Sequence, residues 1–334
     1  MTAITRRRLV AGTTAMLAAS ALGMPFVRRA RAATAISFRL DWTTYGAHAP
    51  FYLALQEKMF DKEGLAVTIG PGQGSGIVSQ LLGRGNDQLA FVDFGTMVKA
   101  ISEGVPVIAV QRLFANLLCV ISHADAPIKT PKDLEGKIIA FAPSESSGQM
   151  LPALMNKSGA DVKKVSILTP AVGAKNALFL ERRADAIPAQ LNVQIAQLEA
   201  QGAKLYYFLY SDFGISLLNQ GLAANVAWLK ANGAAAKAFV AVSVEAHKAA
   251  LADPEKAVDL LIKALPQQAR NKQILLNQME IARNNYVTPA TKDKPFGYMA
   301  AADWDTTLDN LVQYGGLKQK VPLDKLYTNA YQME

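Results

Sequence analysis

The alternation of short apolar runs with helix-patterned segments is the feature that most limits how this chain can fold. In the first third of the sequence, four runs have the length and composition of strands, at 35–40, 65–69, 89–92 and 105–110. Segments with helical spacing of apolar residues separate them, at 50–60, 77–82 and 96–102. This alternation predicts parallel βα units and a doubly wound sheet.

The same pattern restarts after a polar segment at 130–137. Four further strand-like runs follow, at 138–141, 165–168, 184–187 and 205–208, and from about Ala224 the chain is almost wholly helical. We therefore expect an α/β fold of two doubly wound lobes joined by a double-crossover hinge, with a helical C-terminal extension. The predicted division is 33–118 for the first part of lobe 1, 119–214 for lobe 2, and 215–334 for the return to lobe 1 and the C-terminal helices. Ligands of open α/β sheets bind beyond the carboxyl ends of the strands, which here would line the cleft between lobes.

The N-terminus has the order of regions found in an export signal. Paired arginines at Arg6 and Arg7 precede a mildly apolar run, 9–26, and Ala30-Arg31-Ala32 supplies a small-x-small cleavage pattern. The alternatives are a membrane anchor, for which the run is short and weakly apolar, and a basic amphipathic leader with no export role. We expect a twin-arginine-type signal peptide, residues 1–32, cleaved near Ala32, and a mature protein in the periplasm.

Removal of this segment changes the charge of the protein. Residues 1–32 contain six of the 35 basic residues and no acidic residue, so 29 basic residues remain against 27 acidic ones, a net charge of +2 instead of +8. The mature chain has no Lys/Arg run that would indicate a nucleic-acid or anionic membrane partner. We expect a monomer.

The few cysteines and histidines restrict the chemistry further. The single cysteine, Cys119, rules out an intramolecular disulfide and a Cys-rich metal site, and its apolar neighbours predict a buried position. The three histidines, His48, His123 and His247, are far apart and lack metal-ligand spacing. We expect neither a metal nor a cofactor.

Several segments resemble one known family. They are Leu40-Asp41-Trp42, 48–54 (HAPFYLA), 60–65 (FDKEGL), 72–76 (GQGSG), 133–137 (DLEGK) and Phe213-Gly214. Together they are similar to the family that joins pyrimidine-precursor-binding proteins (thiamine-biosynthesis-like) with nitrate-, sulfonate- and taurine-binding proteins, over most of the mature chain to about Asn225. The resemblance implies a type II periplasmic-binding-protein fold and an ABC permease in the inner membrane as the partner that receives a small-molecule ligand.

Candidate ligand-binding residues of the first lobe begin just after its first strand. Trp42 either offers a flat apolar face for stacking at the cleft mouth or is a buried core residue. Tyr45 and His48 follow in the next loop or helical turn. An imidazole there can donate and accept hydrogen bonds, whereas the alternative is a capping or surface histidine. The family position favours ligand contact for His48.

Further candidates follow two later segments of the first lobe. Gly74 and Ser75 lie between a strand and a helix, where the backbone can approach a ligand and the helix N-terminus offers free N–H groups, unless the glycines only form a tight turn. Asp93 and Phe94 end another strand, where Asp93 could bind an amine or ring N–H or instead cap the next helix. Arg112, at the first crossing, suits a ligand carboxylate or sulfonate, or a structural ion pair at the hinge.

The second lobe contributes mainly hydroxyls and amides. Ser146 and Ser147 begin a helix and form either a site for a polar or anionic group or a helix cap. Gln190 and Asn192 follow a strand and could reach the same cleft. The resemblance also assigns Asp212 and Phe213, near the second crossing, to family pocket positions.

One branch of the fold family is enzymatic, and the sequence argues against that function here. The pyrimidine synthases of this branch consume pyridoxal phosphate and one of their own histidines, and carry a lysine with a histidine four residues on. Asp93 and Met97 stand at those positions in this chain, so the amine for a Schiff base is missing. We expect a carrier and no enzyme.

The nature of the ligand follows from the same residues. A pyrimidine precursor is the first choice, with an aromatic carboxylate, an organosulfonate or a nitrate-like anion as the alternative. The segment between Trp42 and His48, Thr43-Thr44-Tyr45-Gly46-Ala47, departs from the vitamin-precursor branch.

Overall fold

Two five-stranded mixed sheets organise the computed structural model, which describes residues 33–332. The expected signal peptide lies outside the described residues. The first sheet has the strand order β2-β1-β3-β10-β4. Its strands are β1 (Thr34–Arg39), β2 (Leu65–Gly70), β3 (Leu89–Asp93), β4 (Val107–Arg112) and β10 (Gln220–Asn225). Strand β10 runs antiparallel to both β3 and β4, whereas β1 is parallel to β2 and β3.

The second sheet repeats this plan, with the order β7-β6-β8-β5-β9. Its strands are β5 (Leu118–His123), β6 (Ile138–Ala140), β7 (Ser166–Leu168), β8 (Ala186–Gln190) and β9 (Leu205–Leu209). Strand β5 is antiparallel to β8 and β9. In each sheet, the strand antiparallel to its neighbours is the first one reached after the chain crosses from the other sheet. We call the first sheet with the helices packed on it the first lobe, and the second sheet with its helices the second lobe.

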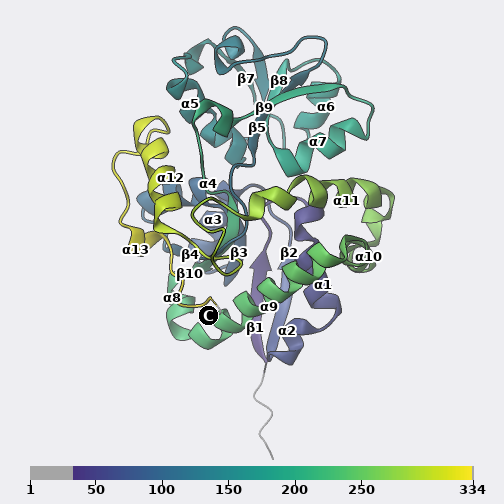
Figure 1. Cartoon of the computed structure of the whole chain (residues 1–334), viewed down its shortest axis with the longest axis vertical. Helices are drawn as coiled ribbons and strands as arrows, with labels where there is room; N and C mark the ends of the chain where they lie inside the picture. Colours follow the sequence, from purple (N-terminus) through teal and green to yellow (C-terminus); the bar gives the residue numbers. More distant parts are fainter. Residues whose placement is uncertain (1–32, 333–334) are drawn as a thin grey trace, which may run out of the picture. The chain divides into compact units, whose positions relative to one another are not determined.

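A helix follows most of the parallel strands, as the labelled elements in Figure 1 show. Those of the first lobe are α1 (Ala49–Gln56), α2 (Met59–Lys62), α3 (Ser75–Gly83) and α4 (Phe94–Ser102), and those of the second are α5 (Ser146–Lys157), α6 (Lys175–Leu180) and α7 (Leu191–Glu199). Two of them, α4 and α7, begin directly at a strand end. Asp93 caps α4 by accepting a hydrogen bond from the Thr96 backbone N–H at 2.9 Å.

Helices dominate the chain after β10, as the sequence predicted. They are α8 (Val226–Ala231), α9 (Gly233–Ala252), α10 (Pro254–Ala264), α11 (Lys272–Ile281), α12 (Ala301–Gln313) and α13 (Leu323–Leu326). Between residues 33 and 332, each helix is too short or too polar to cross a membrane. The predicted fold class, two α/β lobes with a double crossover and a helical C-terminal region, is confirmed.

The chain crosses between sheets after Arg112 and returns between Leu209 and Gln220. The antiparallel strand β10 was not predicted, because Gln-Gly-Leu-Ala-Ala-Asn has neither β-branched residues nor an alternating pattern. Gly221 is required there, since a Cβ would lie 2.3 Å from the Gln111 carbonyl oxygen and from the Phe94 ring. The exact lobe boundaries at 118/119 and 214/215 remain predictions.

Cys119 is buried in β5, as its apolar neighbours predicted. Burial raises the pKa of its thiol to about 12, so the group stays protonated and packs as a small apolar side chain. Its neighbours in the second-lobe core include Ile121, Phe179 and Ile187.

A candidate ligand site between the lobes

A narrow cavity of about 30 Å³ lies between the two lobes. The first lobe contributes polar and aromatic residues that follow its strands, namely Asp41, Trp42, Gly74 and Ser75. The second lobe contributes Glu145, Ser146, Ser147, Lys175, Gln190, Val193 and Gln194. The lobes touch beside it, because Ser144 Oγ donates a hydrogen bond to the Gln73 carbonyl oxygen at 2.6 Å. The two lobes are therefore in direct contact at the edge of the cavity.

Asp41 is held rigidly in the first-lobe wall. It is 3% exposed; its Oδ1 accepts a hydrogen bond from His48 Nε2 at 2.9 Å, and its Oδ2 accepts one from the Tyr45 hydroxyl at 3.3 Å. His48 Nδ1 accepts the Tyr45 backbone N–H at 3.3 Å, so the ring proton of the neutral form sits on Nε2, facing Asp41. Burial, with Asp41 alongside, keeps the pKa of Tyr45 well above its usual value and the hydroxyl a donor.

Gly74 brings the first-lobe backbone close to the second lobe. Its φ of +105° is one that side chains disfavour, and an added Cβ would lie 2.4 Å from the Ser144 carbonyl oxygen. Its backbone N–H donates to the Asp41 carbonyl oxygen at 2.8 Å. The next residue, Ser75, accepts the Asp93 backbone N–H on its Oγ at 3.0 Å, which connects the cavity wall to the end of β3.

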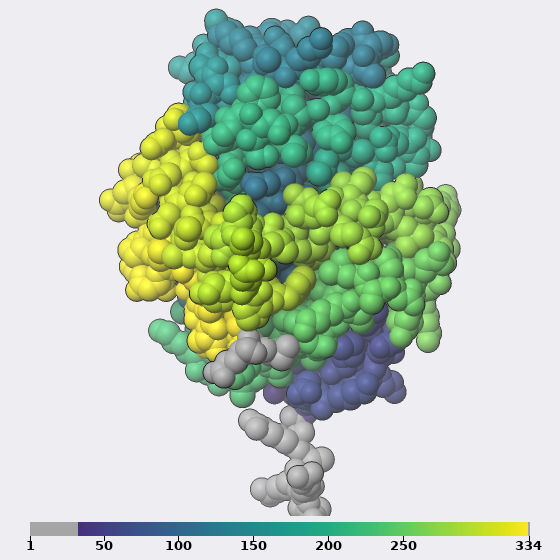
Figure 2. Space-filling view, viewed as in Figure 1, coloured from purple at the N-terminus to yellow at the C-terminus, as the bar shows by residue number. Residues whose placement is uncertain are grey.

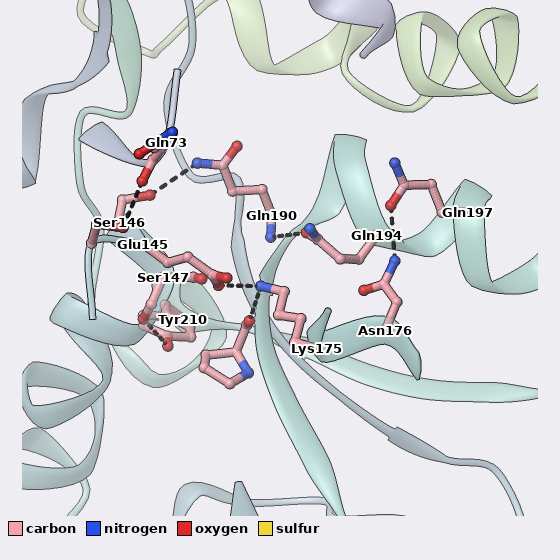
Figure 3. A network of polar contacts seen from close by, with 12 residues as sticks. Gln73, Glu145, Ser146, Ser147, Lys175, Asn176, Gln190, Gln194, Gln197 and Tyr210 are labelled. Atoms are coloured by element: carbon pink, nitrogen blue, oxygen red, sulfur yellow. Dashed lines mark hydrogen bonds and ion pairs between the residues drawn. The ribbon is translucent and has the colours of Figure 1, made fainter. Parts of the chain in front are cut away.

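A buried ion pair dominates the second-lobe wall (Figure 3). Lys175 Nζ lies 2.5 Å from Glu145 Oε2 and also donates to the Pro188 carbonyl oxygen at 2.9 Å. The two side chains are 4% and 6% exposed. The second carboxylate oxygen, Glu145 Oε1, is buried and accepts no hydrogen bond from any residue between 33 and 332.

The amides and hydroxyls of this wall are mutually oriented. Gln190 Nε2 donates to Ser146 Oγ at 3.0 Å, and Gln194 Oε1 accepts the Gln190 backbone N–H at 3.0 Å. The Ser147 carbonyl oxygen accepts a hydrogen bond from the Tyr210 hydroxyl at 2.9 Å. These contacts fix the positions of the strand end and of the first turn of α5, as the labelled side chains in Figure 3 show.

The charged groups of the lining are two carboxylates and one ammonium. Lys175 is already paired with Glu145, and none of the described lining residues is an arginine. No group of potential metal ligands occurs among residues 33–332. Chemically, the cavity suits a small ligand that donates hydrogen bonds and presents a flat face to Trp42.

Six of the predicted site residues line this cavity: Trp42, Gly74, Ser75, Ser146, Ser147 and Gln190. Three more lie directly behind it. Tyr45 and His48 hold Asp41, and Asp93 supports Ser75. Burial raises the pKa of Asp93, whose Oδ2 accepts a hydrogen bond from Asn219 Nδ2 at 2.9 Å.

The other predicted residues lie outside the lining. Arg112 turns toward the C-terminal segment, where its Nη2 donates to Thr291 Oγ1 at 3.0 Å and its Nε to the Tyr298 carbonyl oxygen at 3.3 Å. Phe94 stacks on Trp304 in the core, with ring centroids 5.1 Å apart. Sequence order placed both at strand ends, but the C-terminal segments that cover those ends could not be positioned from sequence.

The remaining three predicted site residues, Asn192, Asp212 and Phe213, also lie outside the cavity lining. Asp212 Oδ2 accepts the Leu209 backbone N–H at 2.8 Å within a turn, and Phe213 packs edge-on against Phe208. Asn192 is fully buried at the start of α7, and its amide has no hydrogen-bond partner among the described residues. A ligand contact for these residues remains a prediction.

Sequence reasoning did not select five lining residues: Asp41, Glu145, Lys175, Val193 and Gln194. Asp41 belongs to the segment Leu40-Asp41-Trp42, which the sequence analysis singled out, and Glu145 directly precedes the candidate Ser146, so their carboxylates were a usable signal. Lys175 has no such signal, because a lysine at a helix start is usually exposed. Its role depends on burial against Glu145 and Pro188.

The residues at the position of the enzymatic branch's lysine and histidine are Asp93 and Met97. Asp93 ends β3 and Met97 is buried in α4. No amine replaces the lysine at this strand end, and the absence of catalysis remains a prediction.

Comparison with known proteins identifies the family. The family model described as NMT1/THI5 like matches residues 46–257. The chain belongs to this family. The resemblance stated from the sequence motifs, to substrate-binding proteins of ABC importers, is thereby confirmed.

Relatives and solved structures agree with this assignment. The formylaminopyrimidine-binding protein of Halalkalibacterium halodurans is 24% identical over 307 residues, covering 88% of this chain and 89% of the relative. The riboflavin-binding protein RibY of Chloroflexus aurantiacus is 23% identical over 297 residues, covering 85% and 82%. The alkanesulfonate-binding protein SsuA from Xanthomonas axonopodis pv. citri superposes with a TM-score of 0.67 at 15% identity, over 88% of this chain and 96% of that one. The last match concerns the fold.

Proposed function

We propose that this protein is the periplasmic binding component of an ABC importer and that it captures a small nitrogen heterocycle of the aminopyrimidine class. The two lobes close around the ring, and the closed form delivers it to the permease without chemical change. The ligand favours the closed form further through contacts that it makes only when both walls surround it.

The observation that carries the choice of ligand is Glu145 Oε1. A buried carboxylate oxygen without a hydrogen-bond donor is costly, and an amine or ring N–H of the ligand would satisfy it. Lys175 occupies only the other oxygen. An aminopyrimidine supplies such donors on a flat ring.

The first-lobe wall is suited to the same ligand. Trp42 is partly exposed at the cavity and offers an aromatic face. Asp41, fixed by His48 and Tyr45, presents a second oriented carboxylate that can accept N–H groups. The hydroxyls of Ser75 and Ser146 can serve ring nitrogens as donors or acceptors.

An anionic ligand is supported less well. The arginine expected to bind a carboxylate or sulfonate, Arg112, donates to Thr291 and Tyr298 outside the cavity. The positive charge in the lining, Lys175, is paired with Glu145. Two relatives are named as a formylaminopyrimidine-binding and a riboflavin-binding protein, which also favours a nitrogen heterocycle.

A thermal-shift screen of the mature chain tests the proposal. The panel contains formylaminopyrimidine, 4-aminopyrimidine, riboflavin, benzoate, ethanesulfonate and nitrate. A ligand at a hundred times its Kd stabilises the native state by about 2.7 kcal/mol, which raises the Tm of a protein of this size by about 4 °C. We expect this shift with the aminopyrimidines; a shift with benzoate or ethanesulfonate alone would refute the proposal.

A pair of variants ties the binding to this cavity. Trp42→Ala removes the aromatic face and is expected to weaken aminopyrimidine binding by about tenfold or more. Tyr207→Ala removes an aromatic ring that is 44% exposed on β9, and should leave the affinity unchanged. Equal affinities of the two variants would place the ligand elsewhere.

A further inference from the structure

The side chain of Gln278, in α11, accepts one buried hydrogen bond and donates another. Its Oε1 accepts the Gly46 backbone N–H at 2.8 Å, and its Nε2 donates to the Val193 carbonyl oxygen at 2.9 Å. The side chain is 1% exposed. Because one partner is a donor and the other an acceptor, only one orientation of the amide satisfies both.

The two partners of Gln278 belong to opposite walls of the ligand cavity. Gly46 begins the short 3-10 helix Gly46–His48, whose last residue holds Asp41. Val193 lies in the first turn of α7 and lines the cavity beside Gln194. One amide thus joins the segment that orients Asp41 to the helix that carries part of the second-lobe wall.

Helix α11 is fixed to the first lobe and meets the second. At Gly46, an added Cβ would lie 2.3 Å from the Leu275 carbonyl oxygen and 2.8 Å from Gln278 Cβ, so the helix packs against this backbone without space. Helix α11 also contacts α10 of the first lobe, whereas its last residue, Ile281, packs on the second-lobe core. Figure 2 shows the green surface of this region directly against the teal surface of the second lobe.

We propose that Gln278 is a positioning residue that latches α7 to the first lobe when the lobes close, without touching the ligand. This inference rests on the proposed closure of the lobes. When the lobes separate, the bond to Val193 has to break, whereas the bond to Gly46 can persist because both residues stay on the first lobe. Gln278 lies beyond residues 46–257, the part matched by the family model, so the latch is built from the C-terminal region of this chain.

Two substitutions distinguish the hydrogen bond between the lobes, from Gln278 to Val193, from the hydrogen bond within the first lobe, between Gly46 and Gln278. Gln278→Glu, measured at a pH where its carboxyl is ionised, keeps an acceptor for the Gly46 N–H but has no hydrogen to donate to the Val193 carbonyl oxygen, so it removes the contact between lobes selectively. Gln278→Met removes both hydrogen bonds without adding charge, and it replaces the first variant if a buried carboxylate prevents folding. Gln273→Glu is the matched control, since it makes the same change at an exposed position of the same helix.

The measurement is the distance between spin labels on Asp61→Cys and Gln201→Cys in the ligand-free mature protein. Both positions are exposed, one on each lobe, and the native Cys119 is buried. We expect the ratio of closed to open molecules to fall about fivefold or more in Gln278→Glu and Gln278→Met, and to stay unchanged in Gln273→Glu. Identical distance distributions in all folded variants would overturn the latch.

This experiment does not depend on the identity of the ligand. If no aminopyrimidine binds, the proposed ligand class fails while the label distances still decide the role of Gln278. If formylaminopyrimidine binds, its dissociation rate should rise in the Gln278 variants and its association rate should not, because the latch acts after the ligand has entered. An unchanged dissociation rate would count against the latch.

Discussion

Replacement of Lys175 by methionine tests how the second-lobe wall is held together. Lys175→Met keeps an unbranched side chain but removes the ammonium that lies 2.5 Å from Glu145 Oε2 and donates to the Pro188 carbonyl oxygen. Glu145, 6% exposed and with its Oε1 already without a partner, would then be a buried carboxylate with no counter-charge. Loss of one member of a buried ion pair costs about 3–5 kcal/mol.

The assay is urea unfolding of the mature chain followed by circular dichroism. We expect the free energy of unfolding to fall by about 3–5 kcal/mol in Lys175→Met, and the double variant Glu145→Gln/Lys175→Met to recover most of it, since the stranded charge is gone. The matched control is Lys248→Met. It breaks an ion pair with Glu245 whose side chains are 56% and 53% exposed, and should have almost no effect.

The reasoning would be refuted by either of two results. One is a Lys175→Met variant as stable as the Lys248→Met control. The other is a double variant as unstable as Lys175→Met alone, because the cost would then come from lost packing instead of an unpaired charge.

Two further predictions concern pH and lobe contact. Burial lowers the pKa of His247 to about 4, so between about pH 6.5 and 4 the unfolded chain binds a proton that the native state does not, and about 3 kcal/mol of stability should be lost as the pH falls through this window. His247→Leu should remove that share of the acid sensitivity in urea unfolding at pH 7 and 4.5, and a difference from wild type that is the same at both values would contradict it. Gly74→Ala places a Cβ 2.4 Å from the Ser144 carbonyl oxygen and at a φ of +105°, so X-ray scattering should show a larger radius of gyration without ligand than for wild type. An unchanged radius would show that the contact between lobes tolerates the methyl group.

The sequence predicted the parts of the site that depend on local order along the chain. Trp42, Ser75 and Ser146 each follow a strand and Gln190 ends one. All four line the cavity because the carboxyl ends of the parallel strands meet there. The βα alternation likewise determined the two lobes, since a helix between parallel strands leaves few other ways to bury both faces of a sheet.

Contacts between distant segments were decided only by the tertiary structure. Strand β10 forms where its backbone completes a sheet, although its sequence has little strand propensity. Arg112 donates hydrogen bonds to Thr291 and Tyr298 outside the cavity. Lys175 lines the cavity, where it forms an ion pair with Glu145. Such partners are far apart in sequence, and the burial that makes each contact strong or costly exists only once the lobes and the C-terminal helices have packed together.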